Sequence, residues 1–333
     1  MDDNYDVVIL GGGAAGLNGA LMLARSRRSV LVIDSGSPRN APADGVHGLL
    51  GREGMPPGEL LALGRAEVES YGGVVLSGEV VAVRPLGPDA AVAAPVADAT
   101  VVTDLRFEVE LADGRVTRAR RLLLASGLAD DLPDLPGLRE QWGRGVLHCP
   151  YCHGWEVRDR RVGVLGTGPM SVHQTLLFRQ LTDDVVLFTR GAELPGEDTE
   201  KLLARGVRVV PDEVTEIVTG GDAVTGVRLA DGTVVARDAV AVGPRMNARA
   251  GFLADLGLAP VEHPMGIGEH VPADPTGRTS VDGVWAAGNV TDPSAQVGAA
   301  AAAGAAAGAQ INADLVAEEA ALAVRRRRAG VPA

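Results

Sequence analysis

The feature that most constrains the fold is a β-turn-α-β unit at the start of the chain. The short apolar run Val7–Leu10 leads into a glycine-rich turn, GGGAAG, at residues 11–16. A segment of helical pattern, LNGALMLARS, follows, and a second apolar run comes after it at Val30–Ile33. Continuous apolar runs of this length are typical of parallel strands that are buried on both faces. The unit therefore predicts a parallel sheet covered by helices.

A second unit with the same pattern begins at Arg161. Its parts are a strand at Val162–Leu165, a turn at 166–171 (GTGPMS), a helix at Val172–Leu181 and a strand at Val185–Phe188. Units of this kind connect with one handedness and bind nucleotides at the turn after the first strand. We therefore expect an α/β fold with two doubly wound, Rossmann-like nucleotide-binding domains.

Composition narrows the classes of partner. A chain of 333 residues with 46% hydrophobic and 22% charged residues is an ordinary globular protein of about two domains. The net charge of −12 argues against nucleic acid and anionic membranes as partners. No run approaches the roughly 18–20 apolar residues of a membrane span, and the acidic start, MDDNYDVVIL, does not resemble a secretory signal. These features predict a cytoplasmic protein.

The first glycine loop has the spacing Gly11-x-Gly13-x-x-Gly16 between a strand and a helix. Gly11 permits the tight turn, Gly13 lets the backbone approach a pyrophosphate, and Gly16 lets the helix pack closely on the strand. Asp34 ends the second strand, where a carboxylate can accept hydrogen bonds from a ribose diol. Because that carboxylate would repel a 2′-phosphate, the loop predicts FAD or NAD and not NADP.

The second glycine loop is degraded. Gly166 and Gly168 remain, but Ser171 replaces the third small residue and Pro169 removes a backbone donor. Arg190 follows the next strand and could meet a 2′-phosphate. The loop is therefore compatible with NADP(H), and equally with a nucleotide-type fold that no longer binds a nucleotide.

Both cysteines lie in one string, Cys149-Pro150-Tyr151-Cys152-His153. A zinc site would need further thiolate or imidazole ligands at a second cluster, and the sequence has no second cysteine pair, so we expect no metal site. The string also matches a covalent haem c signature and a glutaredoxin-like motif. Neither context fits, because the first belongs to exported proteins and the second opens a small domain of its own. A buried structural pair is the remaining alternative to redox chemistry.

A redox dithiol is the interpretation that we favour. Two intervening residues allow an intramolecular disulfide, in which one exposed sulfur would attack the substrate and one buried sulfur would pass electrons inward. His148 and His153 flank the pair, and an imidazole can take up or return a proton near neutral pH. The predicted catalytic residues are Cys149, Cys152 and His153.

Other segments are less distinctive. We expect a helix near Glu59–Ser70, an exposed loop at Pro88–Ala99, and an Ala/Gly-rich helix from Val297 to about Ala321. The last residues, including Arg325–Arg328, are expected to form a solvated tail.

Taken together, these residues resemble the low-molecular-weight thioredoxin reductase family. The block CPYCHGWEVRDRRVGVLGTG has the family's order of dithiol, aromatic residue, strand and second glycine loop. GVWAAGN at residues 283–289 resembles its late FAD motif. The resemblance implies a homodimer with a discontinuous FAD-binding domain, residues 1–118 and 246–333. An NAD(P)-type domain, residues 119–245, would carry the dithiol, with Cys152 against the flavin and Cys149 exchanging with substrate.

The resemblance also extends the list of expected cofactor contacts. The loop after Asp34, the strand at Val80 and the late motif pass along the cofactor in that family. The residues expected to bind FAD are Gly11, Gly13, Ala15, Gly16, Asp34, Asn40, His47, Val80, Gly288, Asn289, Gln296 and Val297. His47 could equally be a surface histidine.

Three departures from the family pattern bear on function. His153 and Asn289 stand where the family has aspartate, and the paired basic residues that mark an NADPH site are reduced to Arg190. These changes resemble the gliotoxin- and holomycin-type FAD-dependent dithiol oxidases. That branch forms the intramolecular disulfide of a small-molecule natural-product dithiol and passes the electrons to oxygen. The alternative is an NADPH-dependent thioredoxin reductase-type disulfide reductase, and the sequence does not identify the substrate.

Overall fold

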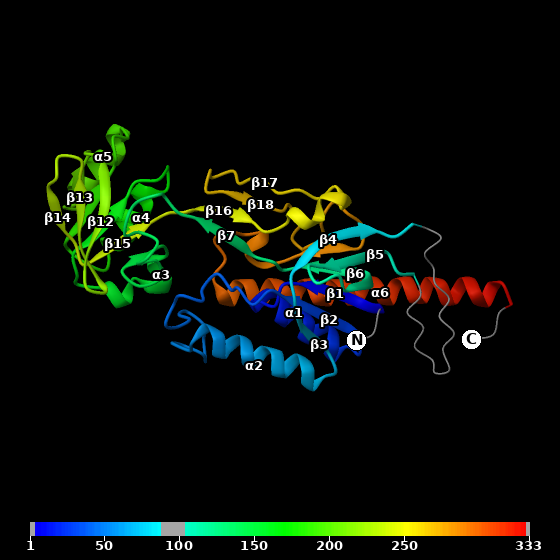
Figure 1. Cartoon of the computed structure of the whole chain (residues 1–333). Coiled ribbons are helices and arrows are strands. Elements are labelled where there is room, and N and C mark those ends of the chain that lie inside the picture. Colours follow the sequence, from blue (N-terminus) through cyan, green and yellow to red (C-terminus); the bar gives the residue numbers. More distant parts are fainter. Residues whose placement is uncertain (1–3, 88–103, 331–333) are drawn as a thin grey trace.

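The computed structural model describes residues 4–87 and 104–330. Two open sheets with parallel strands at their centres lie in separate parts of the molecule, and helices pack against both (Figure 1). The predicted α/β fold with two Rossmann-like units is therefore confirmed. The expected loop at Pro88–Ala99 lies outside the described residues.

The first sheet has the strand order β3-β2-β1-β6-β5-β4, and β19 pairs with β6. β1, β2, β3, β6 and β19 are parallel, whereas β4 and β5 extend the sheet in antiparallel fashion. The bounds are β1 (Asn4–Leu10), β2 (Val30–Asp34), β3 (Val74–Ser77), β4 (Val80–Pro85), β5 (Phe107–Leu111), β6 (Val116–Leu124) and β19 (Val284–Ala286).

Three helices accompany this sheet: α1 (Ala14–Arg25), α2 (Pro57–Ser70) and α6 (Val297–Arg328). α1 and α6 approach each other so closely that a Cβ on Gly304 would lie 1.9 Å from the carbonyl oxygen of Ala15. Leu123 and Trp285 of the sheet pack with Leu23 and Ile311 of these helices in one core. This packing sets Gly304 of α6 directly against the first turn of α1.

The second sheet is parallel throughout, in the order β11-β10-β9-β15-β8. A three-stranded antiparallel sheet, β12-β13-β14, packs beside it through a common core. The bounds of its helices and strands are β8 (Val146–Leu147), α3 (Pro150–His153), β9 (Val162–Leu165), α4 (Ser171–Phe178), β10 (Val185–Phe188), α5 (Gly196–Ala204), β11 (Arg208–Val210), β12 (Val214–Gly220), β13 (Ala223–Leu229), β14 (Val234–Ala236) and β15 (Ala239–Val242). A short 3₁₀ helix, Trp155–Val157, follows α3.

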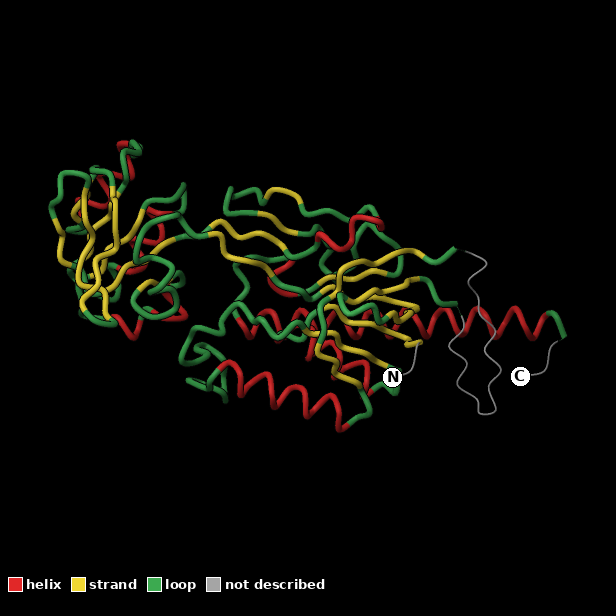
Figure 2. Tube along the Cα trace, in the orientation of Figure 1, coloured by secondary structure: helices red, strands yellow, loops and turns green. Residues whose placement is uncertain are grey.

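The chain crosses between the two sheets twice, through one antiparallel ribbon. β7 (Leu128–Asp131) leads out of the first sheet and β16 (Arg245–Ala248) leads back, and the two strands pair along their length (Figure 2). A hairpin of β17 (Val261–Glu262) and β18 (Glu269–His270) follows. We propose that this ribbon marks the domain boundary. The expected division at residue 246 lies within β16, whereas β6 belongs to the first sheet as far as Leu124, beyond the division expected at residue 118.

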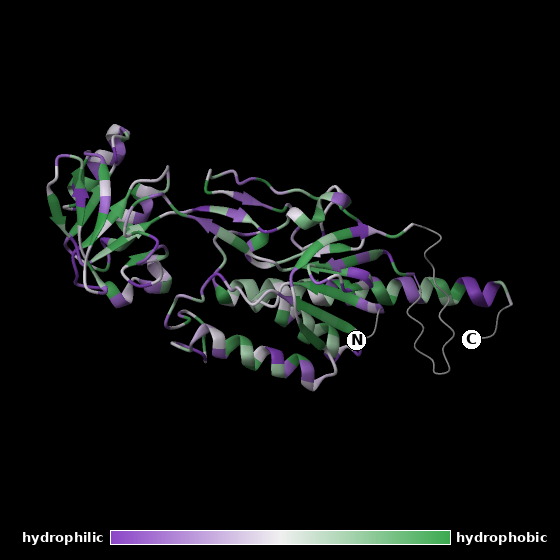
Figure 3. Ribbon diagram, viewed as in Figure 1, coloured by the Kyte–Doolittle hydropathy of each residue, from purple (hydrophilic) through white to green (hydrophobic). Residues whose placement is uncertain are grey.

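The C-terminal segment differs from the expectation. The helix predicted to end near Ala321 continues to Arg328, so Arg325–Arg328 form its last turn and not a separate tail. Arginine is a good helix former, and cations are favourable at a helix C-terminus. These residues form the hydrophilic end of α6 in Figure 3. No helix among the described residues is long and apolar enough to span a membrane.

Charge pairing also anchors this end of α6. Arg120 and Arg121 of β6 are almost fully buried, and both donate to Glu318 of the helix at 2.9 and 3.0 Å. Each buried guanidinium therefore has a carboxylate partner, as burial of a charge requires. A prediction based on apolar periodicity alone misses contacts of this kind.

Candidate active site

A cavity of about 1020 Å³ connects the carboxyl ends of the strands of the first sheet with the dithiol. It brings together all of the site residues expected from the sequence except Gly16. Those that line it are Gly11, Gly13, Ala15, Asp34, Asn40, His47, Val80, Cys149, Cys152, His153, Gly288, Asn289, Gln296 and Val297. The ligand site of an open α/β sheet is expected at this end of the strands.

The first glycine loop forms one wall. Gly11 has φ +114°, which an L side chain rarely adopts, and a Cβ on Gly16 would lie 1.9 Å from the Gly11 carbonyl oxygen. Gly16 therefore acts as a packing residue beneath the loop, as its spacing predicted. A Cβ on Gly13 would meet no atom within 4 Å, so the space in front of the loop is open toward the cavity.

Asp34 closes the far end of this wall. Its carboxylate accepts a hydrogen bond from the Gly36 backbone at 3.3 Å and pairs with Arg65 of α2 at 3.3 Å. Arg65 was not among the expected site residues. Both contacts are long, so the carboxylate retains capacity to accept further hydrogen bonds.

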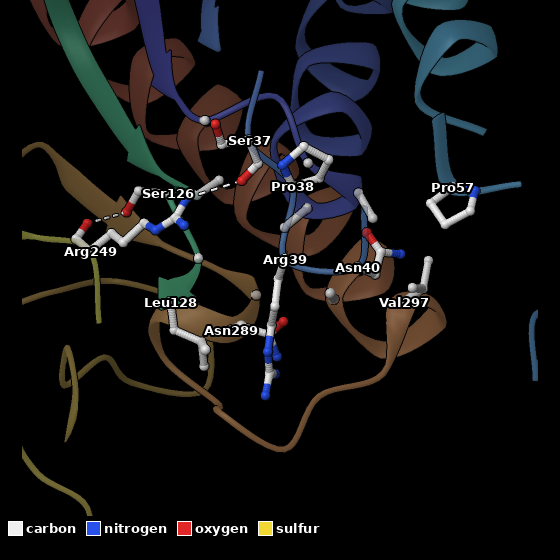
Figure 4. A pocket seen from close by; sticks show the side chains of 18 of the residues that line it. Ser37, Pro38, Arg39, Asn40, Pro57, Ser126, Leu128, Arg249, Asn289 and Val297 are labelled. Atoms are coloured by element: carbon white, nitrogen blue, oxygen red, sulfur yellow. Dashed lines mark hydrogen bonds between the residues drawn. The ribbon is translucent and has the colours of Figure 1, made fainter. Parts of the chain in front are cut away.

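The segment between β19 and α6 forms the opposite wall (Figure 4). A Cβ on Gly288 would lie 2.8 Å from the Cβ of Ala15, so the late motif lies directly on the first loop. The Asn289 side chain donates to the carbonyl oxygens of Asp292 at 3.1 Å and Ala295 at 2.8 Å. An aspartate could not donate these bonds, so Asn289 shapes the turn that leads to Gln296.

The loop after β2 reaches the dithiol helix. His47 pairs with Glu53 at 2.6 Å and lies 3.5 Å from Glu156 of the 3₁₀ helix, and its ring centroid is 6.3 Å from that of His153. His47 is therefore not an isolated surface histidine. It links the first sheet's loop with the segment that follows the two cysteines.

The two sulfurs lie 2.7 Å apart, with the Cys152 thiol donating to Cys149. This hydrogen bond lowers the pKa of Cys149 to about 7, and it raises the pKa of Cys152. Backbone N–H groups of Tyr151 and Cys152 also favour the Cys149 thiolate. The expectation of one exposed and one buried sulfur is wrong: both are half-buried, and hydrogen bonding makes them unequal.

Two histidines flank the pair at the cavity. Desolvation lowers the pKa of His148 to about 4, and it also lowers the pKa of His153. Both imidazoles are therefore neutral at pH 7, and a neutral imidazole can accept a proton. Gln174 fixes the backbone here by donating to the His148 carbonyl at 2.6 Å.

The second glycine loop is closed by its own side chain. The Ser171 hydroxyl accepts hydrogen bonds from the backbone N–H groups of Thr167 at 3.0 Å and Gly168 at 3.3 Å. Those are donors that a nucleotide pyrophosphate would need, and Pro169 has none. Arg190, which follows β10, pairs with Glu213 at 3.7 Å.

Comparison with known proteins shows which family has this arrangement. The family model described as pyridine nucleotide-disulphide oxidoreductase matches residues 5–309. The chain belongs to the pyridine nucleotide-disulphide oxidoreductase family. Thioredoxin reductase tcpT of Claviceps purpurea is 33% identical over 295 residues, covering 85% of this chain and 86% of the relative. Thioredoxin reductase aclD of Aspergillus oryzae is 34% identical over 197 residues, 57% of this chain and 58% of the relative.

Solved structures of this family agree. HlmI is 46% identical, with a TM-score of 0.89 and 99% of each chain covered. An oxidoreductase from Agrobacterium tumefaciens is 36% identical, with a TM-score of 0.83, covering 94% of this chain and 99% of the other. The resemblance to thioredoxin reductase-like flavoproteins is therefore confirmed, and the chain is a flavin-dependent disulfide oxidoreductase with FAD as cofactor.

The first loop fits FAD better than the second fits NADP(H). The open space at Gly13, the N-terminus of α1 and the Asp34 carboxylate offer a pyrophosphate and a ribose the groups that they need. The cavity then continues from this wall to both sulfurs. At the second loop the equivalent donors are occupied by Ser171.

Proposed function

We propose that this enzyme oxidises a small-molecule dithiol, of the natural-product type, to its intramolecular disulfide and passes the electrons to oxygen. In the first half-reaction the Cys149–Cys152 disulfide accepts two electrons and two protons from the substrate dithiol, and the substrate disulfide forms. The enzyme disulfide then re-forms, and oxygen takes up the two electrons and two protons as hydrogen peroxide. Each substrate disulfide therefore consumes one O₂.

The Ser171 hydroxyl is the observation that carries the proposal. It occupies two backbone donors of the second glycine loop, so that loop lacks groups with which it would hold the pyrophosphate of a pyridine nucleotide. The dithiol, by contrast, opens onto the cavity that fits FAD. Electrons then enter through thiols more readily than through NADPH.

The roles of the side chains follow from their environments. Bound FAD supplies a two-electron acceptor beside the dithiol. Cys149, whose pKa is lowered, is the sulfur that exchanges with substrate, and Cys152, whose pKa is raised, returns its proton as the enzyme disulfide forms. Neutral His153 accepts the proton of the incoming substrate thiol.

The alternative is an NADPH-dependent disulfide reductase. Arg190 favours it, because its Nε and the neighbouring Thr189 hydroxyl are buried without a partner among the described residues. A 2′-phosphate could use such groups. The Arg190 guanidinium is paired with Glu213, however, and the Ser171 hydroxyl occupies backbone donors of the second glycine loop.

One anaerobic experiment separates the two functions. The holoenzyme is mixed with NADPH, or with dithiothreitol as the probe dithiol, and flavin absorbance is followed. We expect dithiothreitol to bleach the flavin and admitted air to restore the colour with formation of peroxide, whereas NADPH leaves it oxidised. Rapid bleaching by NADPH, or no peroxide in air with dithiol, would overturn the proposal.

Replacing His153 by alanine should slow flavin reduction by dithiothreitol about 10²-fold at pH 7, the usual contribution of a general base. The loss should shrink as pH rises toward the pKa of the substrate thiol, because thiolate then forms without a base. His173→Ala, an exposed histidine on α4, is the matched control and should react like the parent enzyme. An equal loss at every pH would contradict the role of a base.

The setting is also part of the proposal. We infer a homodimer in the cytoplasm, as the family resemblance and the composition indicate. Sedimentation at micromolar concentration tests the dimer.

A further inference from the structure

Arg39 is the charged residue that sequence analysis did not single out and that the structure places at the centre of the site. It comes from the loop after β2, and its Nε and Nη2 donate to the two carboxylate oxygens of Asp130 at 2.8 and 2.7 Å. The Asp130 side chain is 8% exposed and that of Arg39 24%. Figure 4 shows Arg39 extending toward Asn289 on the opposite wall. A bidentate pair of this kind fixes both groups firmly.

Arg39 contacts both strands of the ribbon that joins the two sheets, and it also contacts the turn before α6. Asp130 belongs to β7, and Nη2 also lies 3.3 Å from the sulfur of Met246 on β16. Nη1 reaches the carbonyl oxygen of Pro293 at 3.4 Å. One guanidinium therefore joins the loop after β2, the ribbon between the sheets and the turn before α6.

This guanidinium also faces the dithiol. Arg39, Cys149 and Cys152 line the same cavity, and the positive charge of Arg39 favours the thiolate form of both cysteines. The same charge opposes protonation of His148, while Asp130 acts in the opposite sense. Arg39 thus acts on sulfurs that the other sheet carries.

Several other ionisable groups surround the pair, and they are of mixed sign. The charged or titratable groups that face the dithiol and its histidines are Arg39, Asp44, His47, Asp130, His148, His153 and Glu156. His148 and His153, whose pKa values are lowered, are neutral at pH 7 and therefore add no positive charge beside the sulfurs. Among the groups that act on the two sulfurs, Arg39 supplies the positive charge.

We propose that Arg39 is a positioning residue that adds to the reactivity of the Cys149–Cys152 pair, with Asp130 holding its charge in place and moderating it. The inference rests on the proposed function only in taking this dithiol as the redox centre. Because a Coulomb interaction falls with distance, the effect requires the dithiol to lie against the first sheet's loop as it does here. Thiolate reactivity is then tied to the docking of the two sheets.

The test uses the holoenzyme, reduced with a phosphine under nitrogen, and measures the rate of Cys149 alkylation by iodoacetamide from pH 5 to 9. Arg39→Gln should slow alkylation at pH 6 by about three- to tenfold, the change expected from a pKa rise of about half to one unit. Asp130→Asn should accelerate it by a similar factor, because the Arg39 charge is left unopposed. Flavin absorbance, recorded after each sample has been reoxidised in air, confirms that FAD is retained.

Opposite signs distinguish this role from a purely structural one. If the pair only clamped the loop to the ribbon, breaking it from either side would change the alkylation rate in the same direction, and the proposal would fall. It would fall equally if both variants matched the parent enzyme. Arg39→Lys should recover part of the rate, and Arg228→Gln, which breaks an Arg–Glu pair between β12 and β13, should leave it unchanged. None of these readouts depends on oxygen or on turnover, so failure of the dithiol oxidase proposal would be seen separately.

Discussion

Serine in place of either Cys149 or Cys152 is expected to reduce dithiol oxidation by at least about 10³-fold, because the two sulfurs act as one unit. The variants should differ in what accumulates. With Cys152→Ser, the Cys149 thiolate can attack a linear disulfide and release one of its thiols, and the mixed disulfide persists because Cys152 is absent to resolve it. With Cys149→Ser, the sulfur whose pKa is lowered to about 7 is lost, and much less adduct should form at neutral pH because burial also raises the pKa of Cys152.

Mass spectrometry after incubation with a linear small-molecule disulfide reads out this difference. Both variants should still purify with FAD, since the first glycine loop and the late motif are untouched. Because the chain has only 2 cysteines, no other thiol can substitute. Full dithiol oxidase activity in either variant would show that the dithiol is not the redox centre.

A second large effect is expected at the first glycine loop, where two substitutions should fail for different reasons. In Gly16→Ala the new Cβ would meet the Gly11 carbonyl oxygen at 1.9 Å, so the loop or α1 must shift. Overpacking of this kind costs about 1–3 kcal/mol in the free energy of unfolding. The apoprotein should therefore melt at a lower temperature.

Gly13→Ala is the matched control, because its Cβ would meet no protein atom within 4 Å. The melting temperature of that apoprotein should equal the parent's, while FAD affinity falls, since the methyl group enters the space that the pyrophosphate needs. Calorimetry of the apoproteins and titration with FAD separate the two cases. If the Gly13 variant binds FAD as tightly as the parent, the pyrophosphate does not bind at this loop.

The fold was largely predictable because apolar strands and glycine turns are local signals. The predicted strands Val162–Leu165 and Val185–Phe188 match β9 and β10, and β1 and β2 are each longer than predicted. Helix ends were less predictable: α4 ends at Phe178 and α6 continues to Arg328. The length of α6 depends on carboxylate–guanidinium pairs with β6, residues far away in sequence.

The candidate site was predictable where motifs mark it and not where it depends on packing. Glycine spacing and the dithiol located the cavity, and all expected site residues except Gly16 line it. Arg39 gave no signal, because an arginine in a loop rich in glycine and proline is ordinary until Asp130 is seen beside it. The sequence shows Ser171 only as a replacement for a small residue, whereas its hydroxyl accepts hydrogen bonds from two backbone N–H groups of the loop. That role depends on where the side chain lies in the fold.

The ribbon of β7 and β16 has a consequence for engineering. Because Asp131 pairs with Arg245, the inserted segment leaves and rejoins the first sheet at neighbouring points. Such an insert can be exchanged as a unit. A tight hairpin or a homologous segment could replace it, and the topology of the first sheet would stay the same. Chimaeras joined at these two points would place the dithiol of one relative beside the first sheet of another.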